Sequence, residues 1–246
     1  MITLEVCANS TQSAINGQKG GAIRVELCDN LSEGGTTPSL SQIEKTRQYI
    51  DIQLNVLIRP REGDFLYSDL EFEIMKQDIH HCGKAGCDGV VFGILNTDGS
   101  IDKERNQDLV KIAHKYRMTI TFHRAFDRCN DLFSSLEDII ELGCDRILTS
   151  GGMESAPEGK EILKKLISQA NDRIIIMPGG GITENNISEL VRATDLKEFH
   201  GSFRSRCRYN GGMQYKSPFF TNEEEYSMLL TDPEKVKQAI ENANNI

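Results

Sequence analysis

We expect the chain to have an α/β fold, a single (β/α)₈ barrel of the TIM type. Its 246 residues fit one such barrel, which typically has about 250. Short runs rich in β-branched residues alternate with amphipathic segments, and this alternation occurs eight times along the chain. No Gly-x-Gly-x-x-Gly follows the first run, so the regular repeat favours a closed barrel over a doubly wound sheet.

Eight predicted strands each precede a predicted helix. The strands span residues 2–7, 22–28, 53–59, 89–93, 118–123, 145–149, 173–177 and 198–202. The helices span about 10–18, 39–49, 68–85, 102–116, 131–142, 156–170, 183–192 and 232–243. Ser68 with Glu71 three residues later fits a capping box, and Asp131 or Thr183 can cap the helices that follow them.

The carboxyl-terminal part departs from this repeat. Residues 1–246 are expected to form one domain, with a long loop or extension at about 203–230. Within it, the stretch from Arg208 to Ser227 fits neither a strand nor a helix, and we expect it to cross one end of the barrel.

Composition and charge exclude several classes of protein. The net charge is −9 and the basic residues are scattered, which argues against a nucleic-acid partner. No apolar run approaches the roughly 18 residues of a membrane span, and the first residues lack the pattern of a signal peptide. Seven cysteines form an odd set without the spacing of a disulfide framework. We therefore expect a cytoplasmic protein with reduced thiols and no membrane partner.

Charged side chains alternate with apolar ones along the predicted strands, so they should point into the barrel. The inward set comprises Thr3, Glu5, Cys7, Arg24, Glu26, Cys28, Asn55, Arg59, Thr119, Thr121, His123, His200 and Ser202. Unpaired buried charges cost several kcal/mol each, so stability alone does not explain this interior. Arg24 with Glu5 or Glu26 equally fits a structural ion pair. Glu5, Arg24, Glu26, Arg59 and His123 are expected to converge, with their polar ends mutually paired.

The inward set also defines the catalytic candidates if the protein is an enzyme. These candidates are Glu5, Glu26, Arg59, His123 and His200. Carboxylates with histidines fit either general acid and base catalysis or a divalent-metal site. No lysine lies on a predicted strand, which disfavours Schiff-base chemistry. Cys82 and Cys87 form too small a group to indicate a metal finger.

Glycines after the last two strands predict an anion site. The candidate residues are Gly179, Gly180, Gly181, Gly201 and Ser202. In such barrels the corresponding loops often hold phosphate through backbone N–H groups, and Arg204 or Arg206 can add positive charge. The alternative is that these glycines only form a tight turn into the helix expected at Thr183.

Several motifs resemble those of the CutC copper homeostasis family. They are Arg24-Val-Glu-Leu-Cys28, Ile58-Arg-Pro-Arg-Glu-Gly-Asp-Phe65, Thr121-Phe-His-Arg-Ala-Phe-Asp127, Leu148-Thr-Ser-Gly-Gly152, Pro178-Gly-Gly-Gly-Ile182 and His200-Gly-Ser202. The likeness runs from residue 1 to about residue 205. It implies a cytosolic barrel, often a homo-oligomer, linked to copper tolerance and expected to bind Cu(I) through cysteines.

Cys7 and Cys28 are the expected copper ligands. They stand 21 residues apart at the carboxyl ends of the first two predicted strands, and the register points both inward. Adjacent strands lie about 4.8 Å apart, a separation that one two-coordinate Cu(I) ion can bridge. The alternative is that both thiols only pack the barrel mouth. Two functions stay open: a Cu(I)-binding homeostasis protein, and a barrel enzyme acting on a small anionic or phosphorylated substrate. A non-catalytic scaffold would leave the charged interior unexplained.

Overall fold

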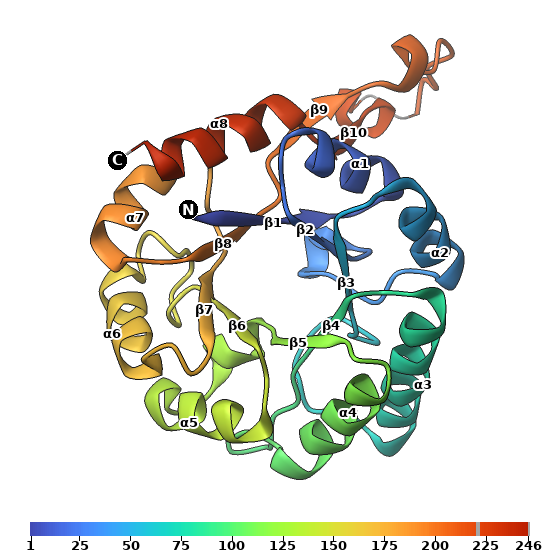
Figure 1. The fold of residues 1–246 in the computed structure, drawn as a ribbon. Coiled ribbons are helices and arrows are strands. Elements are labelled where there is room, and N and C mark those ends of the chain that lie inside the picture. Colours follow the sequence, from blue (N-terminus) through green and yellow to red (C-terminus); the bar gives the residue numbers. More distant parts are fainter. Residues whose placement is uncertain (220–221, 246) are drawn as a thin grey trace.

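Eight parallel strands surround the centre of the computed structural model, which describes residues 1–219 and 222–245. They are β1 (Thr3–Ala8), β2 (Arg24–Leu27), β3 (Gln53–Leu57), β4 (Gly89–Phe92), β5 (Thr119–Phe122), β6 (Arg146–Thr149), β7 (Ile175–Pro178) and β8 (Glu198–Gly201). The strand order is β7-β6-β5-β4-β3-β2-β1-β8, and β7 also contacts β8, so the sheet curves into a nearly closed barrel (Figure 1). The predicted (β/α)₈ fold is confirmed.

A ring of helices covers the outside of the barrel (Figure 1). The helices are α1 (Thr11–Lys19), α2 (Leu40–Tyr49), α3 (Asp69–Ala85), α4 (Lys103–Lys115), α5 (Leu132–Leu142), α6 (Lys160–Ala170), α7 (Ile187–Thr194) and α8 (Pro233–Asn244). The capping box of Ser68 and Glu71 is present at α3, and Asp131 caps α5 through the N–H groups of Phe133 and Ser134. No helix in the described part of the chain has the length and apolar character needed to cross a membrane.

Two helices begin later than expected. Helix α6 starts at Lys160 rather than 156, and α7 starts at Ile187 rather than 183. The expectation that Thr183 caps a helix is wrong, because its N–H donates to Asn186 Oδ1 and its hydroxyl accepts from the Asn185 N–H in a turn before the helix. The glycine-rich loop between β7 and α7 is therefore four residues longer than expected.

Alternation along the strands divides the interior into two zones. Outward-facing residues such as Leu4, Val6 and Val25 are buried between the sheet and the helices, where they form the main hydrophobic core. Many inward-facing residues are polar, and Arg24 heads the described side chains that are fully buried when these are ordered by size. A TIM-type barrel stabilised only by packing would carry branched apolar residues there.

The extension after β8 is a two-stranded ribbon. Strands β9 (Arg204–Cys207) and β10 (Met228–Thr231) pair antiparallel, and β10 is tied to α1 by a hydrogen bond from Asn16 Nδ2 to the Thr231 carbonyl (2.8 Å). Figure 1 shows the ribbon continuing beyond the outer edge of the helix ring. Cys207 therefore lies in a strand, not in a loop, and the connection does not cross the end of the barrel as expected, because its pairing directs it outward.

Candidate functional site at the barrel mouth

A layer of paired charges lies in the middle of the barrel. Arg24 Nε donates to Glu5 Oε2 at 2.5 Å, and Arg24 also pairs with Glu198. Arg146 Nε reaches the same Glu198 oxygen at 2.9 Å. Burial alone would raise the pKa of Glu5, but Arg24 and His200 outweigh it and lower that pKa to about 2. Glu5 and Glu26 were the alternative partners expected for Arg24, and the structure contains the pair with Glu5.

His200 connects this layer to the mouth. Its Nδ1 lies 2.8 Å from Glu5 Oε1, and its Nε2 lies 3.5 Å from Glu26 Oε2. The parallel register places His200 beside Glu5 on the neighbouring strand. Burial alone would lower the pKa of His200, but the Glu26 and Glu5 carboxylates raise it. Burial raises the pKa of Glu26.

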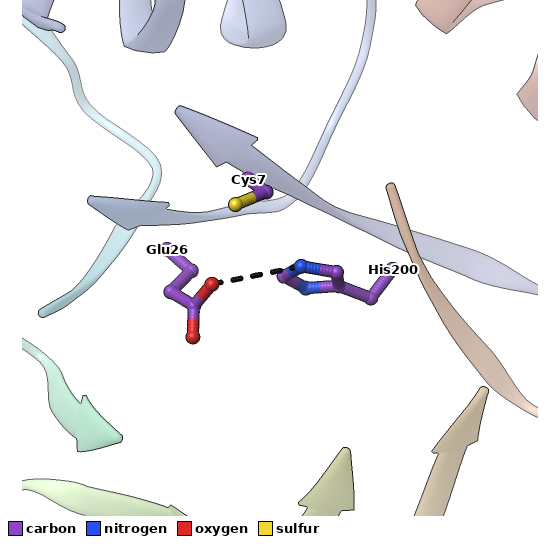
Figure 2. A group of neighbouring side chains, drawn as sticks. All are labelled: Cys7, Glu26 and His200. Atoms are coloured by element: carbon purple, nitrogen blue, oxygen red, sulfur yellow. Dashed lines mark ion pairs between the residues drawn. The ribbon is translucent and has the colours of Figure 1, made fainter. Parts of the chain in front are cut away.

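Two cysteine thiols line the same cavity as His200. The Sγ atoms of Cys7 and Cys28 are 3.7 Å apart, and both residues are buried and free of disulfides. Cys7 also belongs to a group with Glu26 and His200, in which one ligand atom of each residue lies within 4.8 Å of the others. Figure 2 shows these three side chains pointing toward one another from the neighbouring strands β1, β2 and β8. The hydrogen bond with Cys28, burial and the Glu26 charge raise the pKa of the Cys7 thiol, so it is protonated without a metal.

His123 and Arg59 line the cavity but do not join the charge network. The Arg59 guanidinium donates to the carbonyls of Glu33 (3.0 Å), Gly35 (2.7 Å) and Gly63 (3.0 Å), and so ties together the loops after β2 and β3. His123 Nδ1 accepts a hydrogen bond from the Ala125 N–H. All five residues expected to converge are buried inside the barrel. The expectation of mutual pairing is wrong for these two, because Arg59 Nη1 and Nη2 and His123 Nδ1 bond to nearby backbone groups instead.

A cavity of about 460 Å³ opens above these residues. Cys7, Cys28, Glu26 and His200 line it on the side of β1, β2 and β8, and Arg59 and His123 line it elsewhere. Of the residues predicted to bind an anion, Gly180, Gly181, Gly201 and Ser202 line the cavity. Gly179 packs beneath it instead, where an added Cβ would lie 2.4 Å from Leu148 Cδ1. Arg204 lines the cavity, whereas Arg206 pairs with Glu224 on the ribbon.

Sequence reasoning missed three charged residues that complete the interior. Glu198 and Arg146 belong to the paired layer, and Glu198 lies two residues before His200, so the strand alternation contained the signal for it. Arg124 lines the cavity from just beyond β5. Only its place in the motif from Thr121 to Asp127 pointed to it, because strand alternation ends with His123.

Comparison with known proteins identifies the relatives of this chain. Residues 2–205 match the model of the CutC family. The chain belongs to the CutC family. A human protein named "Copper homeostasis protein cutC homolog" is 45% identical over 99% of this chain and 89% of its own length. A CutC family protein of Vibrio vulnificus (strain CMCP6) is 48% identical over 82% of this chain and 81% of its own.

A solved structure shares the fold. The crystal structure of CutC from Streptococcus agalactiae matches with a TM-score of 0.78 and 38% identity. The match covers 82% of this chain and 99% of the Streptococcus chain. The resemblance seen in the motifs is therefore confirmed, and so is its extent to about residue 205. The cytosolic location and the homo-oligomer stay predictions.

Proposed function

We propose that this CutC-family protein acts in copper homeostasis by binding one Cu(I) ion between Cys7 and Cys28. One observation carries the proposal: two buried thiols at the barrel mouth have their sulfur atoms 3.7 Å apart. Thiolates are soft ligands that favour Cu(I). The human relative is named a copper homeostasis protein, which supports the same function.

The donor geometry fits a soft ion. A metal–thiolate bond of about 2.3 Å, the zinc value, lets one ion contact two sulfurs up to about 4.6 Å apart. The Sγ–Sγ distance of 3.7 Å in the structure falls inside that limit. His200 Nε2 offers an imidazole nitrogen next to Cys7, and the hydrogen bond from Nδ1 to Glu5 orients the ring as an outer-shell carboxylate orients a metal-ligating histidine. Cys7 and Cys28 would hold the ion, with His200 as the nearest additional donor.

An anaerobic competition titration against a Cu(I) chelator tests this proposal. The wild type should bind one Cu(I), and Cys7→Ser or Cys28→Ser should weaken binding by at least about a hundredfold, since loss of even an outer-shell partner costs about 10- to 100-fold. Cys144→Ser is the matched control, because Cys144 is also buried but does not line the cavity. Equal affinities in all four proteins would exclude the pair as the site.

A second candidate function is catalysis on a small anionic or phosphorylated substrate. The observation that favours it is the lining of the cavity, which has three arginines, Arg59, Arg124 and Arg204, and one carboxylate, Glu26. Glu26 and His200 would move the proton, while Glu5 holds the His200 ring. Mass spectrometry of small molecules that co-purify with the protein tests this function. We expect the wild type to retain an anion and to turn it over. The Glu26→Gln variant should not turn it over. Wild-type protein without any retained anion would count against it.

A further inference from the structure

The cavity wall at the end of β5 carries two arginines beside a histidine. Arg124 approaches it from the turn directly after His123, and Arg59 lies near His123 on the same side. The two cysteines come from β1 and β2, which lie several strands away around the barrel from β5. His123 and Arg124 are therefore separate from the cysteine pair, and the proposed copper site does not use them.

His123 presents a hydrogen-bond donor without a partner. Burial and the Arg59 guanidinium lower the pKa of His123 to about 3, so the ring is neutral. Its Nδ1 accepts the Ala125 N–H at 3.1 Å, which places the ring proton on Nε2. Among the described residues nothing accepts from Nε2, although the residue is only 4% exposed. A buried donor left unpaired costs free energy, and a ligand oxygen would satisfy it.

Arg124 is held in place by Asp127 of its own motif and by Ser150 of the motif after β6. Its Nε donates to Asp127 Oδ2 at 2.7 Å, and its Nη2 donates to Ser150 Oγ at 2.8 Å. Asp127 in turn accepts from the N–H groups of Ser150 and Gly152. The carboxylate thus fixes both the arginine and the loop after β6. Such support on more than one side is typical of a preorganised binding group.

Gly180 makes room for this arginine. The residue has φ +94°, and a Cβ added to it would lie 3.0 Å from Arg124 Nη1. A side chain there would be strained by the backbone angle and would crowd the guanidinium. The loop after β7 consequently brings backbone, rather than a side chain, to the position where Arg124 meets the cavity.

We propose that this wall binds an oxyanion, a carboxylate or a phosphate group, which accepts hydrogen bonds from His123 Nε2 and from the Arg124 guanidinium. A neutral histidine with a fixed Nε2–H is a suitable donor to such an oxygen, and a guanidinium supplies the opposite charge. The proposal deepens the second candidate function, since it names the chemical class of the substrate's charged end. It is independent of the cysteine pair.

Histidine-labelled protein tests this site by NMR. In full-length protein with ¹⁵N in the imidazole rings, His123 should show the Nε2–H tautomer at neutral pH. Titration with inorganic phosphate, and separately with acetate at the same ionic strength, should shift its Nε2 signal. The anion that binds more tightly identifies the phosphate or the carboxylate as the natural group.

Two arginine variants sharpen the test. Arg124→Met should weaken anion binding by at least about tenfold, the effect of one charge-assisted hydrogen bond, and should keep the wild-type Cu(I) affinity. Arg128→Met is the matched control, because Arg128 lies on the same turn but is exposed and does not line this cavity. Its anion affinity should stay within about twofold of the wild type.

Three results would overturn the proposal. One is a His123 ring protonated on Nδ1, and another is a Nε2 signal that neither anion shifts. The third is equal anion binding by the wild type and Arg124→Met. Because anion binding is measured without turnover or copper, each of these results is distinct from a failure of catalysis or of Cu(I) binding.

Discussion

The middle and the mouth of the barrel differ in how their polar groups are satisfied. In the middle, Arg24 is matched by Glu5 and Glu198, and the guanidinium and both carboxylates are closely paired. At the mouth, two thiols contact mainly each other and His123 keeps a free N–H donor. Charges that satisfy one another hold the barrel together, whereas the two thiols and the His123 N–H belong to residues that line the cavity and are available to a ligand. The comparison thus separates structural from functional residues within one polar interior.

Removing the central cation should produce the largest loss of stability. Arg24→Met leaves Glu5 and Glu198 buried beside an apolar side chain, and breaking a buried pair in this way costs about 3–5 kcal/mol. Arg124→Met at the mouth should cost less than about 1 kcal/mol, because that side chain is 41% exposed. Urea unfolding of both variants measures the difference. Equal losses would remove the distinction between the two regions.

Acid should destabilise the fold through His123. The pKa of His123 in the folded protein is about 3, below the ordinary value of 6.5. Between pH 3 and pH 6.5 the unfolded chain therefore binds a proton on this ring that the folded protein does not. The stability that the neutral ring contributes is complete above about pH 6.5 and is lost as the pH falls toward 3. The free energy of unfolding should therefore fall by about 1.4 kcal/mol per pH unit from this group. His123→Gln should remove that part of the slope in urea unfolding between about pH 4 and 6, and parallel curves would contradict the assignment.

A pair of buried threonines should give the smallest effect but the cleanest contrast. Both are fully buried, but Thr121 Oγ1 has no partner in the described structure, whereas Thr149 Oγ1 bonds to Asp127 and accepts from the Gly151 N–H at 2.9 Å. Thr121→Val should be neutral or stabilising by up to about 1 kcal/mol, while Thr149→Val should cost about 1–3 kcal/mol. Thermal unfolding of both variants checks this, and a larger loss for Thr121→Val would contradict it.

The sequence was sufficient to predict the barrel and most of its polar interior. Period-two alternation identified Glu5, Arg24, Glu26 and His200 as inward-facing, because each strand of a closed barrel has one face toward the helices. It also placed Cys7 and Cys28 at the mouth, where their sulfur atoms are in contact. All of these positions could be predicted because the direction of a strand side chain depends only on its place in the alternation along that strand.

Features that depend on loops could not be predicted in this way. Arg59 binds backbone carbonyls of two loops, and a sequence pattern does not reveal where those carbonyls point. Arg124 lies beyond the end of β5, so alternation does not reach it. Strand β9 reads Arg-Ser-Arg-Cys, which lacks an apolar alternation, and its partner β10 begins more than 20 residues later. Tertiary pairing, rather than local propensity, makes it a strand.

X-ray absorption at the copper edge tests the central claim most directly, namely that the thiols of the mouth are the ligands of Cu(I). Protein loaded anaerobically with one equivalent of Cu(I) should show two sulfur neighbours around the ion, and Cys144→Ser should give the same spectrum. The Cys7→Ser variant should lose one of these sulfurs. A copper ion surrounded only by nitrogen and oxygen, or an unchanged sulfur shell in the Cys7→Ser and Cys28→Ser double variant, would contradict the account.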